Sequence, residues 1–257
     1  MLSLPVAGVA VQLQLPRGAD DIALLEAGTP SVEVAVTLLA NIVRRYDGLP
    51  LDWPTLAMTD IDVLLLSLRQ QVIGDRLSAE VVCQADACGE RVDIVLSIAD
   101  YVEHHRPRPP ARVAAVDQTW FRLDGLDVEF RVPSVADQLA IASEERSEQA
   151  LARRCMRPPE TSSRARRRVE TAMEALAPSL ASELTGSCPE CGAAVSAWFD
   201  PLQYVLRELR EQAEFVYDDV CAIARLTHWS ETDILALPAA RRARYAELAQ
   251  SAMAYAR

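Results

Sequence analysis

The sequence contains no lysine, and all 26 of its basic residues are arginine. This absence excludes three kinds of chemistry, because a Walker A phosphate loop, a Schiff-base enzyme and a lysine general base each need that side chain. No apolar stretch is long enough to span a bilayer. The N-terminus also lacks the charged segment, apolar run and cleavage site of a signal peptide. We therefore expect a cytoplasmic protein that has no membrane partner.

Aromatic residues make up only 5% of the 257 residues, and the formal net charge is −11. Nucleic-acid binding depends on neutralised phosphates and on stacked aromatic rings, so neither number favours it. The sequence also lacks a Gly-rich phosphate loop, a His-Glu-x-x-His zinc motif and a nucleophile elbow. These absences favour a protein that is not an enzyme.

Two cysteine pairs lie far apart in the chain, each followed by glycine and then by an extended stretch. They are Cys83-Gln-Ala-Asp-Ala-Cys88 and Cys188-Pro-Glu-Cys191. This is the layout of a zinc ribbon, in which two knuckles each supply two thiolates to one tetrahedral metal. The alternatives are a lost metal site, a redox pair or a disulfide. The pattern predicts a structural Zn²⁺, because four thiolates leave no open position for an activated water.

Seven arginines gather in one stretch that otherwise contains prolines and hydroxyl residues. Two interpretations are open: a basic loop that leads into a solvated helix face, or a docking patch for an acidic partner. The arginines are Arg153, Arg154, Arg157, Arg164, Arg166, Arg167 and Arg168.

A short pattern occurs twice. Val11-Gln-Leu-Gln-Leu-Pro16 before Ala19-Asp20 matches Val128-Glu-Phe-Arg-Val-Pro133 before Ala136-Asp137, and each copy continues through helical sequence to a cysteine knuckle. We interpret this as a divergent tandem duplication, with chance agreement as the alternative. The predicted domains are a first repeat unit at 1–105, a Pro-rich linker at 106–116, a second repeat unit at 117–200 and a helical region at 201–257.

The expected fold class is α+β, mostly helical, with a small antiparallel zinc-ribbon-like sheet built from the two knuckles and an internal pseudo-duplication. Apolar residues at helical spacing predict helices over about 31–46 and 59–72. Asp200-Pro201 begins a further helix that the same spacing carries to about residue 226. A last helix is predicted over 239–255.

Together these motifs resemble the T4-type baseplate hub assembly chaperones of contractile phage tails and contractile injection systems. The resemblance is carried by Gly74-Asp75-Arg76, both knuckles, the strand-Pro-x-x-Ala-Asp motif, Trp198-Phe-Asp200 and the stretch from His228 to Pro238 with the arginines and Tyr245 after it. It covers most of the chain. The first knuckle departs from it, because four residues separate its cysteines where the family is expected to have two.

The resemblance implies a non-enzymatic, zinc-stabilised assembly chaperone or scaffold that binds baseplate hub or spike proteins and associates transiently with the assembling particle. Two other functions compete. The knuckles and the arginine cluster would also suit a zinc-ribbon nucleic-acid-binding or regulatory protein, although the charge disfavours it. A metal-dependent enzyme would need an open coordination site. The sequence does not define the oligomeric state.

Overall fold

The computed structural model describes residues 1–159 and 162–255, the last three of these by backbone alone. The fold is α+β, with helices and small antiparallel sheets, as the sequence predicted. The chain divides into two compact units, which we describe separately. The hairpin unit comprises Met1–Val11 and Arg45–Pro201, and the helical unit comprises Gln12–Arg44 and Leu202–Arg257.

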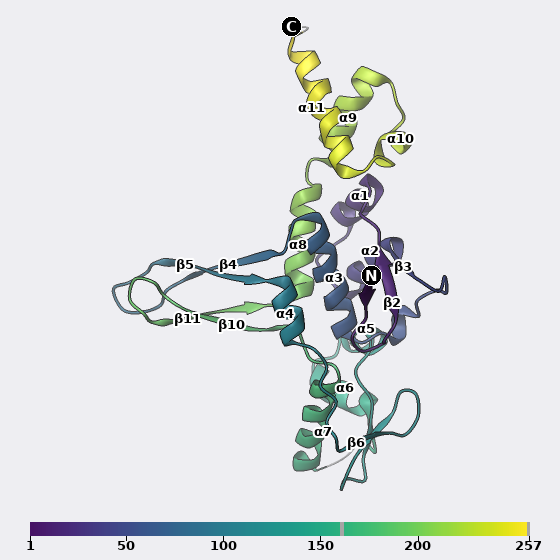
Figure 1. The fold of residues 1–257 in the computed structure, drawn as a ribbon, viewed down its shortest axis with the longest axis vertical. Coiled ribbons are helices and arrows are strands. Elements are labelled where there is room, and N and C mark those ends of the chain that lie inside the picture. Colours follow the sequence, from purple (N-terminus) through teal and green to yellow (C-terminus); the bar gives the residue numbers. More distant parts are fainter. Residues whose placement is uncertain (160–161, 256–257) are drawn as a thin grey trace. The chain divides into compact units, whose positions relative to one another are not determined.

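The hairpin unit contains the central helix α3, two β-hairpins and a four-stranded sheet (Figure 1). Its helices are η1 Trp53–Thr55, α3 Met58–Val72, α4 Ile98–His104, α5 Val135–Ile141, α6 Ser147–Cys155 and α7 Ser163–Leu176. Its strands are β1 Leu2–Ser3, β4 Arg76–Val82, β5 Arg91–Ser97, β6 Val113–Ala115, β7 Phe121–Leu123, β8 Glu129–Phe130, β9 Met156–Arg157, β10 Ser182–Ser187 and β11 Ala194–Phe199.

Helix α3 forms the core of this unit. Its residues from Thr59 to Arg69 are buried on nearly every side of the helix, as expected of a helix that other elements cover, whereas Val72 at its end is exposed. The buried carboxylate of Asp60 accepts hydrogen bonds from the backbone N–H groups of Val6 and Ala7, at 2.9 and 3.0 Å. The N-terminal turn is thereby fixed to the start of α3.

The helical unit contains α1 Gly18–Glu26, α2 Val32–Ile42, α9 Val216–Thr227, α10 Glu231–Leu235, α11 Ala239–Tyr255 and all of α8 (Pro201–Ala213) after its first residue. Arg242 of α11 is buried and pairs with Asp21 of α1 at 2.6 Å and with Asp219 of α9 at 3.2 Å. Gly18 is required here, because a Cβ atom at this position would lie 2.7 Å from the Leu235 side chain. The contacts of α1 with Arg242 and Leu235 join segments that are more than 200 residues apart in sequence.

Two predicted helices are shorter than expected. The helix predicted to reach residue 46 ends at Ile42, where the chain becomes strand β3 (Val43–Arg45) and the Ile42 carbonyl accepts from the Gln14 N–H at 2.8 Å. The helix predicted over 201–226 divides into α8 and α9. The N-cap residue of α9, Phe215, lies outside helical geometry, and two aspartates follow in the first turn of α9, where the helix dipole favours them.

The predicted single sheet for both knuckles is also wrong, because the knuckles lie on two separate two-stranded sheets, β4–β5 and β10–β11. The sequence did not predict the four-stranded antiparallel sheet β6-β7-β8-β9. Phe130 of β8 and Met156 of β9 are paired in its register, and both pack against Val169 of α7. The strands of this sheet are only two or three residues long, so none of them spans a full alternating pattern.

The order of elements recurs along the chain. Strand β2 (Ala10–Leu13) is followed by two helices, a strand, the short helix η1, α3, a hairpin and α4. Strand β8 is followed by two helices, a strand, α7, a hairpin and α8, so the series differ by η1. The N-cap residues Arg17 and Ser134 share the backbone angles φ −108° and ψ 171°. In both, the N-cap N–H donates to the carboxylate three residues later, Asp20 or Asp137, at 2.9 and 3.0 Å.

Candidate metal centre

Two β-hairpins lie side by side (Figure 1). The four motif cysteines come after the paired ends of β4 and β10, near the tips of these hairpins. In the first, β4 and β5 pair antiparallel from Arg76–Ser97 to Val82–Arg91. In the second, β10 and β11 pair from Ser182–Phe199 to Ser187–Ala194. Alternate residues of each hairpin are buried and exposed, so each presents one apolar face to the other.

The first cysteine of each pair occupies the same position in its hairpin. Cys83 follows the last residue of β4 and donates its N–H to the Glu90 carbonyl, while Cys188 follows β10 and donates to the Ala193 carbonyl, both at 2.8 Å. Each ladder therefore continues one residue beyond its strands. This fixes the backbone of the buried cysteine before the chain turns through the knuckle.

The four sulfur atoms lie within 4.8 Å of one another. Across the two hairpins, Cys83 Sγ is 3.6 Å from Cys191 Sγ, and Cys88 Sγ is 3.8 Å from Cys188 Sγ. A tetrahedral ion with metal–sulfur bonds of about 2.3 Å would place its ligands about 3.8 Å apart. A disulfide needs about 2.05 Å. The spacing therefore suits four thiolates around one metal ion, and the sequence predicted the complete set.

The surroundings of the sulfurs differ between the members of each pair. Cys83 and Cys188 are buried against Val92 and Val195, whereas Cys88 is half-buried and Cys191 is exposed. The backbone N–H groups of Cys191 and Glu190 point at the Cys188 sulfur and lower the pKa of that thiol to about 7. Cys188 is thus disposed to the thiolate form that a metal would bind, whereas burial and the neighbouring thiols raise the pKa values of Cys83 and Cys88.

The two knuckles turn in different ways. Both have a glycine with positive φ after the second cysteine, Gly89 at +65° and Gly192 at +72°, where an L side chain would be strained. The longer first knuckle also contains Ala87 in the left-handed region, at +62°. This additional turn accommodates the two extra residues and lets Cys88 approach the other three sulfurs.

The two remaining cysteines lie elsewhere. Cys155 is buried at the end of α6, as a cysteine in a helical pattern is expected to be, and burial raises the pKa of its thiol to about 12. Cys221 is exposed, on the solvent side of α9.

The arginine cluster is divided by its contacts. Four of the seven arginines bond or stack within the hairpin unit: Arg154 pairs with Asp137, Arg157 stacks 3.6 Å above the Trp120 ring, Arg166 pairs with Glu170 and Arg168 donates to the Asp124 carbonyl. In the part of the chain that the structure describes, Arg153, Arg164 and Arg167 are exposed and make no such contact.

The sequence did not predict a buried ionic cluster around Asp137. The Asp137 side chain is 1% exposed and accepts hydrogen bonds from Arg131, Arg154 and the Ser134 hydroxyl. Burial would raise the pKa of this carboxyl, but these bonds outweigh it and hold the pKa below its usual range. The Ser134-x-x-Asp137 spacing is a capping-box pattern that could have indicated the cap, but nothing local indicated Arg154.

No family model, curated protein or solved structure matches this chain. The class that the fold and site define is therefore an α+β protein with a four-cysteine cluster capable of holding a metal ion. In the segments that the structure covers, no helix is both long and apolar enough to cross a bilayer.

Proposed function

We propose that the chain is a zinc-stabilised assembly chaperone or scaffold for the baseplate hub of a contractile injection system or phage tail. The observation that carries the proposal is the convergence of four sulfurs from two distant hairpins at the spacing of one tetrahedral ion. The sequence motifs that resemble the baseplate hub assembly chaperones supply the biological role.

Zinc is the metal we propose, because a closed set of four thiolates is typical of structural Zn²⁺ sites and is rare for Mg²⁺ or Ca²⁺. Cys83 and Cys88 would hold it from one hairpin, and Cys188 and Cys191 from the other. The ion would supply a crosslink that stabilises the fold. With four protein ligands it would have no position for substrate, so the role we assign is not enzymatic.

We further propose that the two halves arose by duplication. The recurring order of elements, the matched N-cap geometry of Arg17 and Ser134, and the equivalent places of Cys83 and Cys188 support this. In such a zinc-ribbon-like arrangement each copy contributes one knuckle, so the metal would join the two copies.

Co-purification tests the biological role. The tagged full chain, produced in cells that assemble a contractile tail, should recover hub or spike components, and the Cys188→Ser variant should recover less of them. Metal analysis of the purified chain should give one zinc per chain. Absence of every hub and spike component from the wild-type sample would contradict the chaperone role, whatever the metal content.

The alternative function, a zinc-ribbon nucleic-acid-binding or regulatory protein, is suggested by the two knuckles and the arginine cluster. Its test is a mobility shift with DNA or RNA at several salt concentrations. Binding that weakens steeply with salt would support it, because counterions are released when arginine neutralises phosphate.

A further inference from the structure

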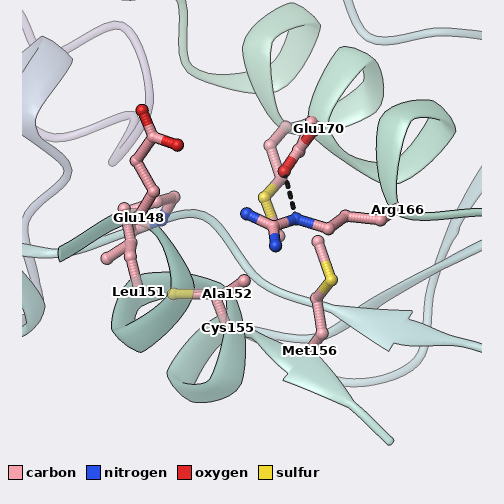
Figure 2. Close-up of a pocket in the computed structure, with 9 residues that line it drawn as sticks. Glu148, Leu151, Ala152, Cys155, Met156, Arg166 and Glu170 are labelled. Carbon is pink, nitrogen blue, oxygen red and sulfur yellow. Dashed lines mark hydrogen bonds and ion pairs between the residues drawn. The ribbon is translucent and has the colours of Figure 1, made fainter. Parts of the chain in front are cut away.

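Helices α6 and α7 and strand β9 surround a groove of about 310 Å³ (Figure 2). Most of its lining is apolar or sulfur-containing, from Pro133, Leu151, Ala152, Cys155, Met156 and Met173. Its charged lining residues are Glu148, Arg166 and Glu170. Flexible methionine side chains let such a groove adapt to different apolar side chains.

Arg166 reaches into this groove. Its Nε atom donates to Glu170 Oε1 at 2.7 Å, one turn further along α7. Figure 2 shows the rest of the guanidinium directed across the groove toward the side of α6 that carries Glu148, Leu151 and Ala152. The two terminal nitrogens of this planar group can bind a carboxylate through two parallel hydrogen bonds. The groove thus combines an apolar lining with a guanidinium group that can bind a carboxylate.

The local charge differs in sign from the charge of the chain. Residues 147–176 contain seven arginines and four glutamates, a net charge of +3, whereas the whole chain carries −11. Arg167, next to Arg166 on α7, is exposed and unpaired within the described residues. Glu148 and Glu170 in the groove lining offset Arg166, so the attraction for an anionic partner comes from the exposed arginines beside the groove, such as Arg167.

We infer that the groove between α6 and α7 binds an acidic, amphipathic segment of a partner protein. An apolar side chain of that segment lies between Leu151 and Met173, and a neighbouring carboxylate binds Arg166. This inference rests on the proposed function, because it names the surface through which the chaperone would hold its client. The client segment is recognised by apolar residues at helical spacing flanked by Asp or Glu.

Two other occupants fit the groove less well. Single-stranded nucleic acid is bound by stacking bases on aromatic rings, and none of the described residues that line the groove is aromatic. Thiol chemistry on a small molecule would need a reactive Cys155, but burial raises the pKa of that thiol to about 12. The geometry favours a peptide.

Methionine-methyl NMR on the full zinc-loaded chain tests the inference. The probe is an acetylated peptide of leucine and glutamate with leucines at helical spacing, and its control replaces every glutamate by glutamine. Of the five methionines, Met156 and Met173 line the groove. Their signals should shift with the acidic probe, those of Met1 and Met58 should not, and binding should weaken as salt screens the charges.

Three variants sharpen the test. Arg166→Gln should weaken probe binding about tenfold, the loss expected for one charge-assisted pair. Glu170→Gln releases the guanidinium and should tighten binding about threefold, an effect in the direction opposite to that of a folding defect. The matched control is Arg207→Gln, which removes another arginine paired with a glutamate four residues later, in α8, and should leave the affinity unchanged.

Several outcomes would overturn the inference: equal affinity for the glutamine peptide, unshifted Met156 and Met173, an unaffected Arg166→Gln variant, or a single-stranded oligonucleotide that displaces the probe at lower concentration. The proposed function is judged separately. If hub or spike components co-purify equally well with Arg166→Gln and wild type, the groove is not the binding site, but the chaperone role is supported. If the probe binds as expected but no such component co-purifies, the groove is a binding site, but the chaperone role is contradicted.

Discussion

Helices α3 and α7 occupy the same place in the two recurring series of elements, each directly before a cysteine hairpin, yet their surfaces are opposite in character. In α3, ten of fifteen residues are buried, among them Asp60, Asp62 and Arg69. In α7, three of fourteen are buried, and four of the other eleven are arginines. One helix forms a core and the other presents a charged surface.

The starts of the two helices show how this difference is built into the sequence. Helix α7 begins conventionally, because the Ser162 hydroxyl accepts from the Ala165 N–H at 3.2 Å. Helix α3 begins after Ala57, which offers no side-chain cap, and its polar first-turn residues bind other segments. Thr59 donates to the Pro178 carbonyl at 2.9 Å, and Asp60 holds the N-terminal turn. A core helix uses its first turn to organise the fold around it.

The largest effect is expected where the two halves converge, at the cysteines. Cys83→Ser and Cys188→Ser should each abolish zinc binding and lower the free energy of unfolding by about 5 kcal/mol, less than the ~10 kcal/mol of isolated zinc peptides because a core also exists here. Metal content and urea unfolding would measure both. The control is Cys221→Ser, which changes an exposed thiol outside the cluster. A Cys188→Ser chain with full zinc content and full stability would contradict the proposed site.

Because α3 is buried and α7 is largely exposed, substitutions in the two helices should change the free energy of unfolding by different amounts. Leu65→Ala in α3 removes a fully buried side chain and should cost about 4 kcal/mol, since a cavity remains. Arg164→Ala in α7 changes an exposed residue and should stay within about 0.5 kcal/mol. Urea denaturation of both variants measures the difference. Similar losses at the two positions would show that α7 is covered as α3 is.

The matched helix caps provide a third comparison. Asp137→Asn should cost about 3 kcal/mol at neutral pH, because it leaves Arg131 without its buried partner. Asp20→Asn, at the equivalent exposed cap, should cost about 0.5 kcal/mol. Since the pKa of Asp137 is lowered in the folded state, its contribution is present at neutral pH and declines as the pH falls below about 4. The difference between wild type and Asp137→Asn should therefore shrink on acidification. A loss that is constant with pH would argue against the ionic cluster.

The sequence predicts features that depend on nearby residues. The α+β class, the start of α3, the strands after each knuckle and the full cysteine set followed from apolar periodicity and from motif spacing, which are local signals. Paired cysteines at this spacing also have few possible roles, namely a metal site, a redox pair or a disulfide, so the cysteine pattern is a specific signal. The tetrahedral spacing across the two hairpins agrees with that specificity.

What the sequence did not predict depends on long-range contacts. The association of α1 with α9 and α11 rests on Arg242, which no local pattern distinguishes from Arg241. The break before α9 interrupts an apolar stripe that continues through it. The groove needed two helices and a strand whose packing becomes apparent only in three dimensions. For the arginine cluster, composition showed the charge but could not show which arginines already have partners.

The smallest predicted effect returns to the buried carboxyls of α3. Burial, and to a lesser extent the charge of Asp200, raise the pKa of Asp62 to about 8, and burial raises that of Asp60 to about 6. An acid whose pKa is higher in the folded state binds its proton more tightly there than in the unfolded chain. Its contribution to stability is therefore greatest at low pH and is lost as the pH rises from the unfolded pKa near 4 to the folded pKa.

Asp60 is about half ionised at pH 6 and almost fully ionised above about pH 7, so the loss of stability between pH 7 and 8 belongs mainly to Asp62. Asp62→Asn should remove that loss and raise the free energy of unfolding by about 2 kcal/mol at pH 8, with little gain near pH 4. Urea denaturation across this range measures the slope. Asp93→Asn, on the exposed face of β5, is the control and should leave the slope unchanged. An Asp62→Asn chain that is less stable than wild type at pH 8 would mean that the core needs the ionised carboxylate. Helix α3 would then contain a charged site, as α7 does.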